Sequence, residues 1–184
     1  ERLRLRPFSI PDIDSLQAGL NDPKISRRLT NIPYPYTFES ARAWVWRMWD
    51  EEKKNPRTRI DLAITKKGET GIIGSVAFIN IDDHRAQVSY WLAAAHEGNG
   101  YMTEALRALV RYGFEVLGFM RIHGYTFHEN FHSQRVLEKS GFTREGICRM
   151  EWKRMIDGHP VYFDSLLYAI LQPQWETMNL RPVE

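Results

Sequence analysis

The stretch from residue 87 to residue 128 constrains the fold most, because its hydrophobic periodicity changes twice. The apolar, aromatic run QVSYWLAAA is typical of a buried strand, and the glycines of HEGNG follow it. The next segment, YMTEALRALVRYGFEVLGF, repeats apolar residues at helical spacing, and RIHGYTFH is strand-like again. A strand, a helix and a strand in this order predict two parallel strands joined by a right-handed crossover. We therefore expect a sheet with at least one parallel pair.

The remaining segments predict mainly antiparallel strands around that pair. The turns KKGET and IDDHRA separate three successive strand-like segments, and DGHP joins the last two strands as a hairpin. We expect one α+β domain over residues 1–184, with a mixed, mostly antiparallel sheet of about seven strands and helices on both faces. The expected strands are 2–6, 59–66, 70–80, 86–94, 120–130, 142–156 and 161–171, and the expected helices are 9–22, 39–55, 101–119 and 132–141.

Composition excludes several functional classes. The 184 residues are 43% hydrophobic and 26% charged, with a formal net charge of +2, which argues against disorder and offers no electrostatic case for nucleic-acid binding. The single cysteine, Cys148, leaves no intrachain disulfide and no CxxC zinc pair, and no His/Cys/Asp cluster has metal-ligand spacing. We find no signal peptide and no apolar run long enough for a membrane span. The prediction is a soluble, cytoplasmic domain without a metal, nucleic-acid or membrane partner.

The glycine turn before the central helix can be interpreted in two ways. Backbone N–H groups at a helix start have no helical partner, and Gly98 and Gly100 would let a phosphate approach them closely. The other interpretation is a plain strand-to-helix turn. A Walker loop is excluded because there is no GxxxxGK[ST], and a dinucleotide GxGxxG is excluded because Thr103 occupies the last glycine position. These residues alone leave the ligand open.

The surrounding pattern resembles the core of the GNAT superfamily of N-acetyltransferases, and within it the RimJ/RimL-like branch. The likeness extends from RLRLRPFSIPDID to SLLYAILQPQW. The family's diphosphate loop, Gln/Arg-x-x-Gly-x-Gly/Ala, corresponds here to residues 97–102, with Glu97 and Met102 at positions that usually carry other residue types. We expect backbone contacts to the diphosphate and a Glu97 side chain that points away from it. The second matching pattern consists of Asn130, Ser133, Val136, Leu137, Glu138, Lys139, Gly141 and Phe142.

The resemblance implies the GNAT fold, with coenzyme A held between a splayed pair of parallel strands, and acetyl-CoA as the cofactor. The acetyl group would pass by direct attack onto a primary amine. The implied cofactor-binding residues are those of the first strand (Trp91, Leu92, Ala93), those of the loop (Glu97, Gly98, Asn99, Gly100, Tyr101, Met102, Thr103), and Asn130 with Ser133. Dimers are common in this branch, so a homodimer is also implied.

Such a transfer needs a proton acceptor for the ammonium group and a proton donor for the leaving thiolate. By the resemblance, Ser133 is the donor, although it could equally be the N-cap of its helix. Glu151 is the proposed base, with a solvated strand carboxylate as the alternative. Other candidates for the base are Asp82, Asp83 and His84 in a turn, and His123 and His128 in a strand, where structural roles are more common.

The acceptor is the least constrained part. The loop NIPYPYTF carries Tyr34 and Tyr36, and loops of this kind often set specificity, so these tyrosines are predicted to line the acceptor site. Trp44, Trp46 and Trp49 of the next helix are predicted to lie in the core or at an oligomer surface. The favoured acceptor is a protein or peptide N-terminal amine. The alternatives are a small amine (a polyamine, an amino acid or an antibiotic-like compound) or a non-catalytic acyl-CoA-binding domain.

Overall fold

The structure, a computed structural model, describes residues 2–29, 32–156 and 158–179. A seven-stranded sheet has the order β1-β2-β3-β4-β5-β7-β6, and every neighbouring pair is antiparallel except β4 and β5. The strands are β1 Leu3–Arg6, β2 Ile60–Lys66, β3 Gly74–Ile79, β4 Arg85–Leu92, β5 Arg121–Phe127, β6 Thr143–Ile156 and β7 His159–Leu171. The helices are η1 Ile10–Asp12, α1 Ile13–Leu20, α2 Pro23–Arg28, α3 Phe38–Glu52, η2 Ala94–His96, α4 Tyr101–Glu115, α5 Phe131–Lys139 and α6 Gln172–Asn179. The predicted fold class is confirmed.

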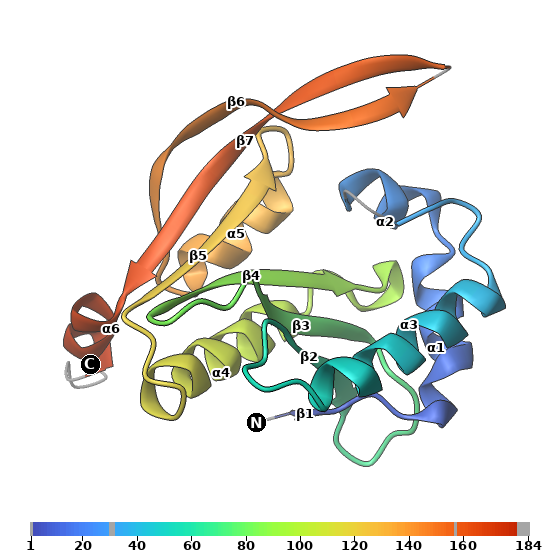
Figure 1. Cartoon of the computed structure of the whole chain (residues 1–184), viewed down its shortest axis with the longest axis horizontal. Helices are drawn as coiled ribbons and strands as arrows, with labels where there is room; N and C mark the ends of the chain where they lie inside the picture. Colours follow the sequence, from blue (N-terminus) through green and yellow to red (C-terminus); the bar gives the residue numbers. More distant parts are fainter. Residues whose placement is uncertain (1, 30–31, 157, 180–184) are drawn as a thin grey trace.

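Helices cover both faces of this sheet (Figure 1), and each face has its own apolar core. Alternate residues of a strand point to opposite faces, so Ile64 packs beneath α4 and α5 while its neighbour Ala63 packs beneath α1 and α3. Leu106 and Leu109 of α4 are fully buried on the first face, as is Val45 of α3 on the second. The two cores hold the sheet between two layers of helices.

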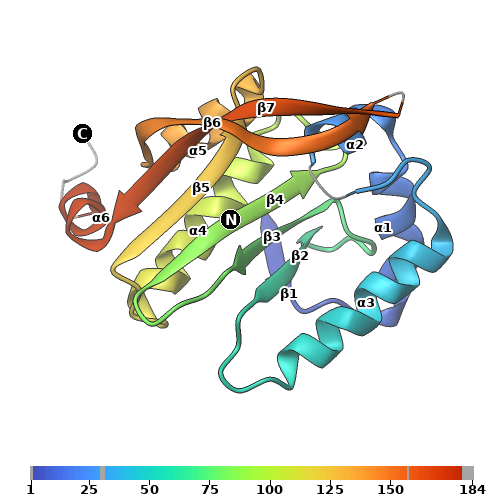
Figure 2. The ribbon, with the colours of Figure 1, turned by 45° about the horizontal axis from the view of Figure 1, so that its top comes forward.

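The parallel strands β4 and β5 pair only at one end. Their register runs from Arg85↔Arg121 to Gln87↔His123, whereas β4 continues to Leu92 and β5 to Phe127. The two strands then diverge, as Figure 2 shows. The predicted parallel pair and its splay are therefore both present. The divergence leaves a gap between β4 and β5 on the side where β4 leads into the glycine loop, residues 97–102.

Two helical assignments from the sequence need correction. Residues 23–28 form a separate helix, α2, which is not among the helices predicted above. Its start is set by Asp22, whose side chain accepts from the Lys24 N–H, and by Pro23. The helix expected over 132–141 begins at Phe131, because Asn130 is its N-cap. Ser9, the first residue of the helix expected over 9–22, is the N-cap of η1, and Asp12, which is 1% exposed, accepts from the Ser9 N–H and from the Arg6 guanidinium.

Candidate functional site

The loop between β4 and α4 has the backbone that an anion site requires. Gly98 (φ +80°) and Gly100 (φ +75°) both adopt left-handed conformations, and Gly100 is the N-cap of the 15-residue helix α4. The Asn99 amide donates to the carbonyl oxygens of His96 (3.2 Å) and Glu97 (3.0 Å) and so braces the turn. A Cβ atom at Gly98 would meet nothing within 4 Å. The first N–H groups of α4 therefore border open space at the positive end of the helix dipole.

The two unusual residues of this loop have clear positions. Glu97 pairs with Arg28 of α2, with 2.6 Å between Oε1 and Nη1, so a guanidinium offsets the charge of the carboxylate. Met102 is 6% exposed and packs in the core beneath α4, which keeps its side chain away from the loop surface. At the other end of the loop, Arg2 binds Glu104 (2.8 Å) and donates to the Asn99 carbonyl (3.0 Å).

The open edge of β4 presents specific backbone groups to the gap. Ala93 already uses both of its groups, since its N–H donates to Ile73 (2.9 Å) and its carbonyl accepts from His96 (2.9 Å). Hydrogen-bonded and non-hydrogen-bonded pairs alternate along an antiparallel register. The backbone groups of Trp91, opposite Ser75, therefore also point toward β3, whereas those of Leu92 point toward β5. Among the three predicted strand contacts, only Leu92 therefore directs its backbone groups into the gap. The Trp91 ring packs against Gly19, where an added Cβ would lie 2.8 Å from it.

Ser133 and Tyr90 meet across this gap. Asn130 Oδ1 accepts from the Ser133 N–H (3.2 Å), so Asn130 is the N-cap and the alternative role of Ser133 as the cap is wrong. The Ser133 hydroxyl is hydrogen-bonded to the Tyr90 hydroxyl at 2.8 Å, and Tyr90 also donates to the Ser133 carbonyl at 3.3 Å. Burial raises the pKa of Tyr90, although the bond to Ser133 acts in the opposite direction. Tyr90 is thus a neutral phenol that orients Ser133.

Glu151 lies at an irregularity of β6. The register with β7 shifts between Cys148 and Trp152, so β6 carries more residues than β7 across this stretch. Within it, Met150 has φ +52° and donates its N–H to Asp164 Oδ1 (2.8 Å). Glu151 is exposed at this bulge.

His123 lies on the same face of β5 as Tyr125. Its Nδ1 is buried and has no hydrogen-bond partner within the described part of the chain. Burial, together with the nearby Arg121 and Arg85, lowers the pKa of His123 and favours the neutral imidazole. The pKa of Tyr125 is raised, mainly by burial and then by the nearby Cys148 and Glu151. The ring centroids of Tyr125 and His123 lie 5.8 Å apart. His123 is therefore the second candidate base, while His128 follows the end of β5.

The other predicted residues divide between turn, core and surface. The Asp82 carboxylate accepts from the Asp83 N–H, and the His84 carbonyl accepts from the Met120 N–H. These hydrogen bonds hold the turn before β4 in place, which is a structural role. Tyr36 is 3% exposed within the core of α1 and α3, and burial raises its pKa to about 12. Its assignment to the acceptor wall is therefore wrong. Tyr34 is 57% exposed and available.

Arg154 is a residue that sequence reasoning missed. Its guanidinium donates to the carbonyls of Arg27 and Leu29 (2.7 Å each) and stacks 4.7 Å from the Phe127 ring. These contacts fasten the β6–β7 hairpin over the end of α2, an arrangement visible in Figure 1. No local pattern signals this role, because the partners are 125 and 127 positions away.

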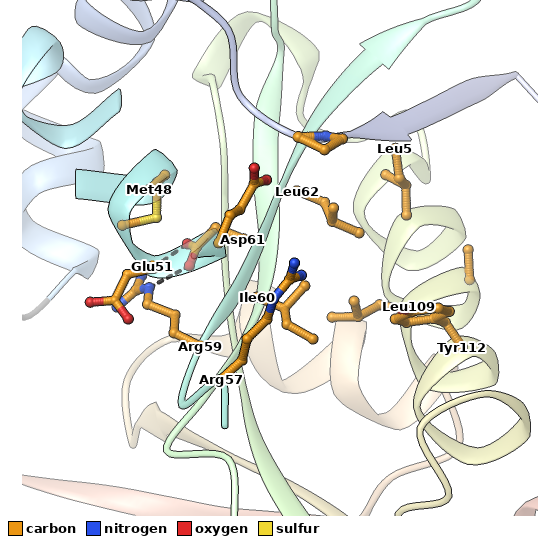
Figure 3. A pocket seen from close by; sticks show the side chains of 13 residues that line it. Leu5, Met48, Glu51, Arg57, Arg59, Ile60, Asp61, Leu62, Leu109 and Tyr112 are labelled. Carbon is orange, nitrogen blue, oxygen red and sulfur yellow. Dashed lines mark hydrogen bonds and ion pairs between the residues drawn. The ribbon is translucent and has the colours of Figure 1, made fainter. Parts of the chain in front are cut away.

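A separate cavity of about 400 Å³ lies between α3, β2 and α4 (Figure 3). Ile60 and Leu62 line it together with Arg59, which donates to Asp61 (2.9 Å). None of the predicted site residues, including those of the glycine loop, lines this cavity. Within the described residues, no group of three or more His, Cys, Asp or Glu side chains could hold a metal ion, and no helix is long and apolar enough to cross a membrane.

Comparisons with known proteins agree with this geometry. Residues 2–143 match the acetyltransferase (GNAT) domain family. The chain is 31% identical to the uncharacterized N-acetyltransferase p20 of Bacillus licheniformis over 172 residues, which are 91% of this chain and 93% of p20. Among solved structures, it resembles the ribosomal-protein-S5-alanine acetyltransferase of Vibrio fischeri (TM-score 0.78, 22% identity, 95% and 96% covered). It also resembles spermidine N-acetyltransferase of Vibrio cholerae in complex with CoA and spermine (TM-score 0.77, 21% identity, 95% and 98% covered).

Proposed function

Since the chain belongs to the acetyltransferase (GNAT) family and is an acetyl-CoA-dependent N-acetyltransferase, we propose that its acceptor is the N-terminal amine of a protein or peptide, as in the RimJ/RimL-like branch. The charge of the acceptor side carries this proposal. Arg154 of β6 donates to the backbone carbonyls of Arg27 and Leu29, so the cations of Arg27, Lys153 and Arg154 belong to neighbouring segments on this side of the chain. A polyamine would bring several positive charges against these cations, whereas a peptide brings one amine and a carboxylate or neutral backbone.

The residues of the gap fit acetyl-CoA. The left-handed glycine loop provides N–H groups and open space for a diphosphate, and Leu92 directs its backbone toward the splayed strands. We assign the diphosphate contacts to the backbone of residues 97–103 and a pantetheine contact to the side-chain NH₂ of Asn130. Bound acetyl-CoA supplies an acetyl group activated as a thioester.

We assign the two proton transfers to Glu151 at the β6 bulge and to Ser133 in α5. Glu151 accepts a proton from the acceptor ammonium, which frees the nitrogen lone pair for attack on the carbonyl carbon. As the carbon–sulfur bond breaks, Ser133 donates a proton to the sulfur, with Tyr90 holding its hydroxyl in place. Tyr34 forms part of the acceptor wall.

We further propose that the chain forms one domain, that it assembles as a homodimer and that it is located in the cytoplasm. Sedimentation velocity tests the dimer.

The acceptor class is tested by thiol release from acetyl-CoA across matched amines at equal concentration. The panel holds peptides with free N-terminal Ala, Ser or Met, their N-formylated counterparts as controls, spermidine, spermine and free amino acids. We expect turnover with the free peptides, none above hydrolysis with the blocked ones, and a mass increase located at the α-amine. Faster turnover of spermidine than of every peptide would contradict the proposed acceptor and favour the small-amine alternative.

Glu151→Gln is expected to lower kcat about tenfold at pH 7 with a peptide acceptor, and to lose this effect by pH 9. The reason is that an α-amine has a pKa of about 7.7–8.0, so about a tenth of it is already neutral at pH 7 and nearly all of it at pH 9. A pH–rate profile measures this, with CoA affinity expected to stay unchanged. His123→Asn is the comparison variant: if it reproduces the profile and Glu151→Gln matches the wild type, His123 is the base.

A further inference from the structure

The first residue of the glycine loop carries a charge of the wrong sign for a diphosphate site, and Arg28 corrects it. We propose that Arg28 is a cofactor-binding residue whose guanidinium is shared between Glu97 and the diphosphate of acetyl-CoA. The proposal rests on the assignment of the loop to the diphosphate. It adds a cation from α2 to a site that the backbone alone would otherwise form.

The position of Arg28 supports a direct contact. Its Nη1 lies 2.6 Å from Glu97 Oε1, and Glu97 immediately precedes Gly98. Both side chains are 34% exposed, so the pair borders the solvent-facing side of the loop rather than the core. A guanidinium has five N–H donors in a planar fork and can bind both carboxylate and phosphate oxygens. One edge on Glu97 leaves the other edge for an oxygen of the ligand.

The backbone of α2 around Arg28 is fixed by contacts at both of its ends. Asp22 caps the start of α2, and Arg154 donates to the Arg27 and Leu29 carbonyls on either side of residue 28. Because the backbone is fixed at both ends, binding a phosphate orders little besides the Arg28 side chain itself, and this favours affinity.

The other arginine beside the loop has a different role. Arg2 is engaged by the Glu104 carboxylate, the Asn99 carbonyl and the Tyr101 ring, 4.6 Å away, and its side chain is 55% exposed. Its contacts join the start of β1 to the first turn of α4, so it stabilises the helix start. The Arg2 guanidinium divides its donors between Glu104 and the Asn99 carbonyl, whereas Arg28 is bound to Glu97 by one edge, so Arg28 is the better placed cation for the ligand.

The experiment is isothermal titration of CoA and dephospho-CoA into the purified full chain, using the wild type, Arg28→Gln, Glu97→Gln and the double variant. Arg28→Gln is expected to weaken both ligands by the same factor, about tenfold, because losing one charge-assisted phosphate contact has an effect of this order. The decisive comparison is made in the Glu97→Gln background, where there is no carboxylate to neutralise. There, Arg28→Gln should still weaken binding several-fold.

Three results would overturn the proposal. An unchanged affinity on adding Arg28→Gln to Glu97→Gln means that Arg28 only neutralises Glu97. A loss with CoA but not with dephospho-CoA means that Arg28 contacts the 3′-phosphate instead. An equal loss in Lys24→Gln, the control on the exposed side of the same helix, means that the effect is only long-range charge. Arg28→Lys, which keeps the charge, should recover part of the affinity, and melting curves confirm that each variant is folded. A wild-type chain that binds no CoA would refute the loop assignment instead.

Discussion

Gly98→Val is expected to raise the dissociation constant of acetyl-CoA by about two orders of magnitude. The site is open in the folded chain, since a Cβ atom at Gly98 would have no neighbour within 4 Å. A valine there would extend into the space assigned to the diphosphate and would strain a backbone at φ +80°. Several N–H contacts of roughly 0.3–1 kcal/mol each would be lost together. A combined loss of about 3 kcal/mol corresponds to the expected hundredfold change.

A matched control separates this effect from strain. Gly68, in the turn between β2 and β3, also has φ +80° and also has nothing within 4 Å of an added Cβ. Gly68→Val should therefore lower the melting temperature about as much as Gly98→Val while leaving acetyl-CoA affinity unchanged. Titration calorimetry and thermal melting measure the two quantities. Equal affinities for Gly98→Val and the wild type would remove the loop from the cofactor site.

The sequence was sufficient for those parts of the fold that depend on local patterns. Alternating apolar residues located the strands, and the order of strand, helix and strand between 87 and 128 predicted the parallel pair β4–β5. Gly98 and Gly100 marked the loop because left-handed backbone just before a helix favours glycine. In each case the signal and the structure it determines lie within about 40 residues of each other along the chain.

The errors concern residues whose roles depend on tertiary contacts and not on local periodicity. Tyr36 was predicted to line a surface, but Asn21 and Gln17 of the preceding segment bind its backbone and its ring lies in the core. The pairing of Arg28 with Glu97 spans 69 positions, and the contacts of Arg154 span more than 120. Arginine is exposed in most sequence contexts, so no periodicity distinguishes one that fastens two elements from one that is merely solvated.

The same long-range contacts place α2 between the two parts of the proposed site. Arg28 joins this helix to the glycine loop, and Arg154 joins its end to the β6–β7 hairpin, which carries Glu151. A six-residue helix that was absent from the sequence prediction thus connects the proposed cofactor and acceptor sides. Its local signal, Asp22 followed by Pro23, is present in the sequence, but a helix this short has too few residues to show apolar periodicity.

Ser133→Ala is expected to lower kcat at least a hundredfold with little change in the affinity for acetyl-CoA. General acid catalysis typically contributes 10²–10⁴-fold, about what removal of the proposed donor to sulfur would forfeit. The helix α5 should tolerate the change, because Asn130 caps it through the backbone N–H of residue 133, which alanine retains. Steady-state kinetics with the best peptide acceptor and calorimetric titration of CoA provide the two measurements.

Tyr90→Phe is the control that separates proton donation from the hydrogen bond alone. Both variants remove the 2.8 Å bond between the two hydroxyls, so both should lose comparable stability, about 1 kcal/mol. Only Ser133→Ala removes the group assigned to donate to the sulfur, so its kcat should fall well below that of Tyr90→Phe. Equal kcat values would assign the effect to the orientation of α5 against β4 and not to a proton held by Ser133. In Tyr90→Phe the serine keeps its hydroxyl but loses the partner that orients it, which predicts an intermediate kcat.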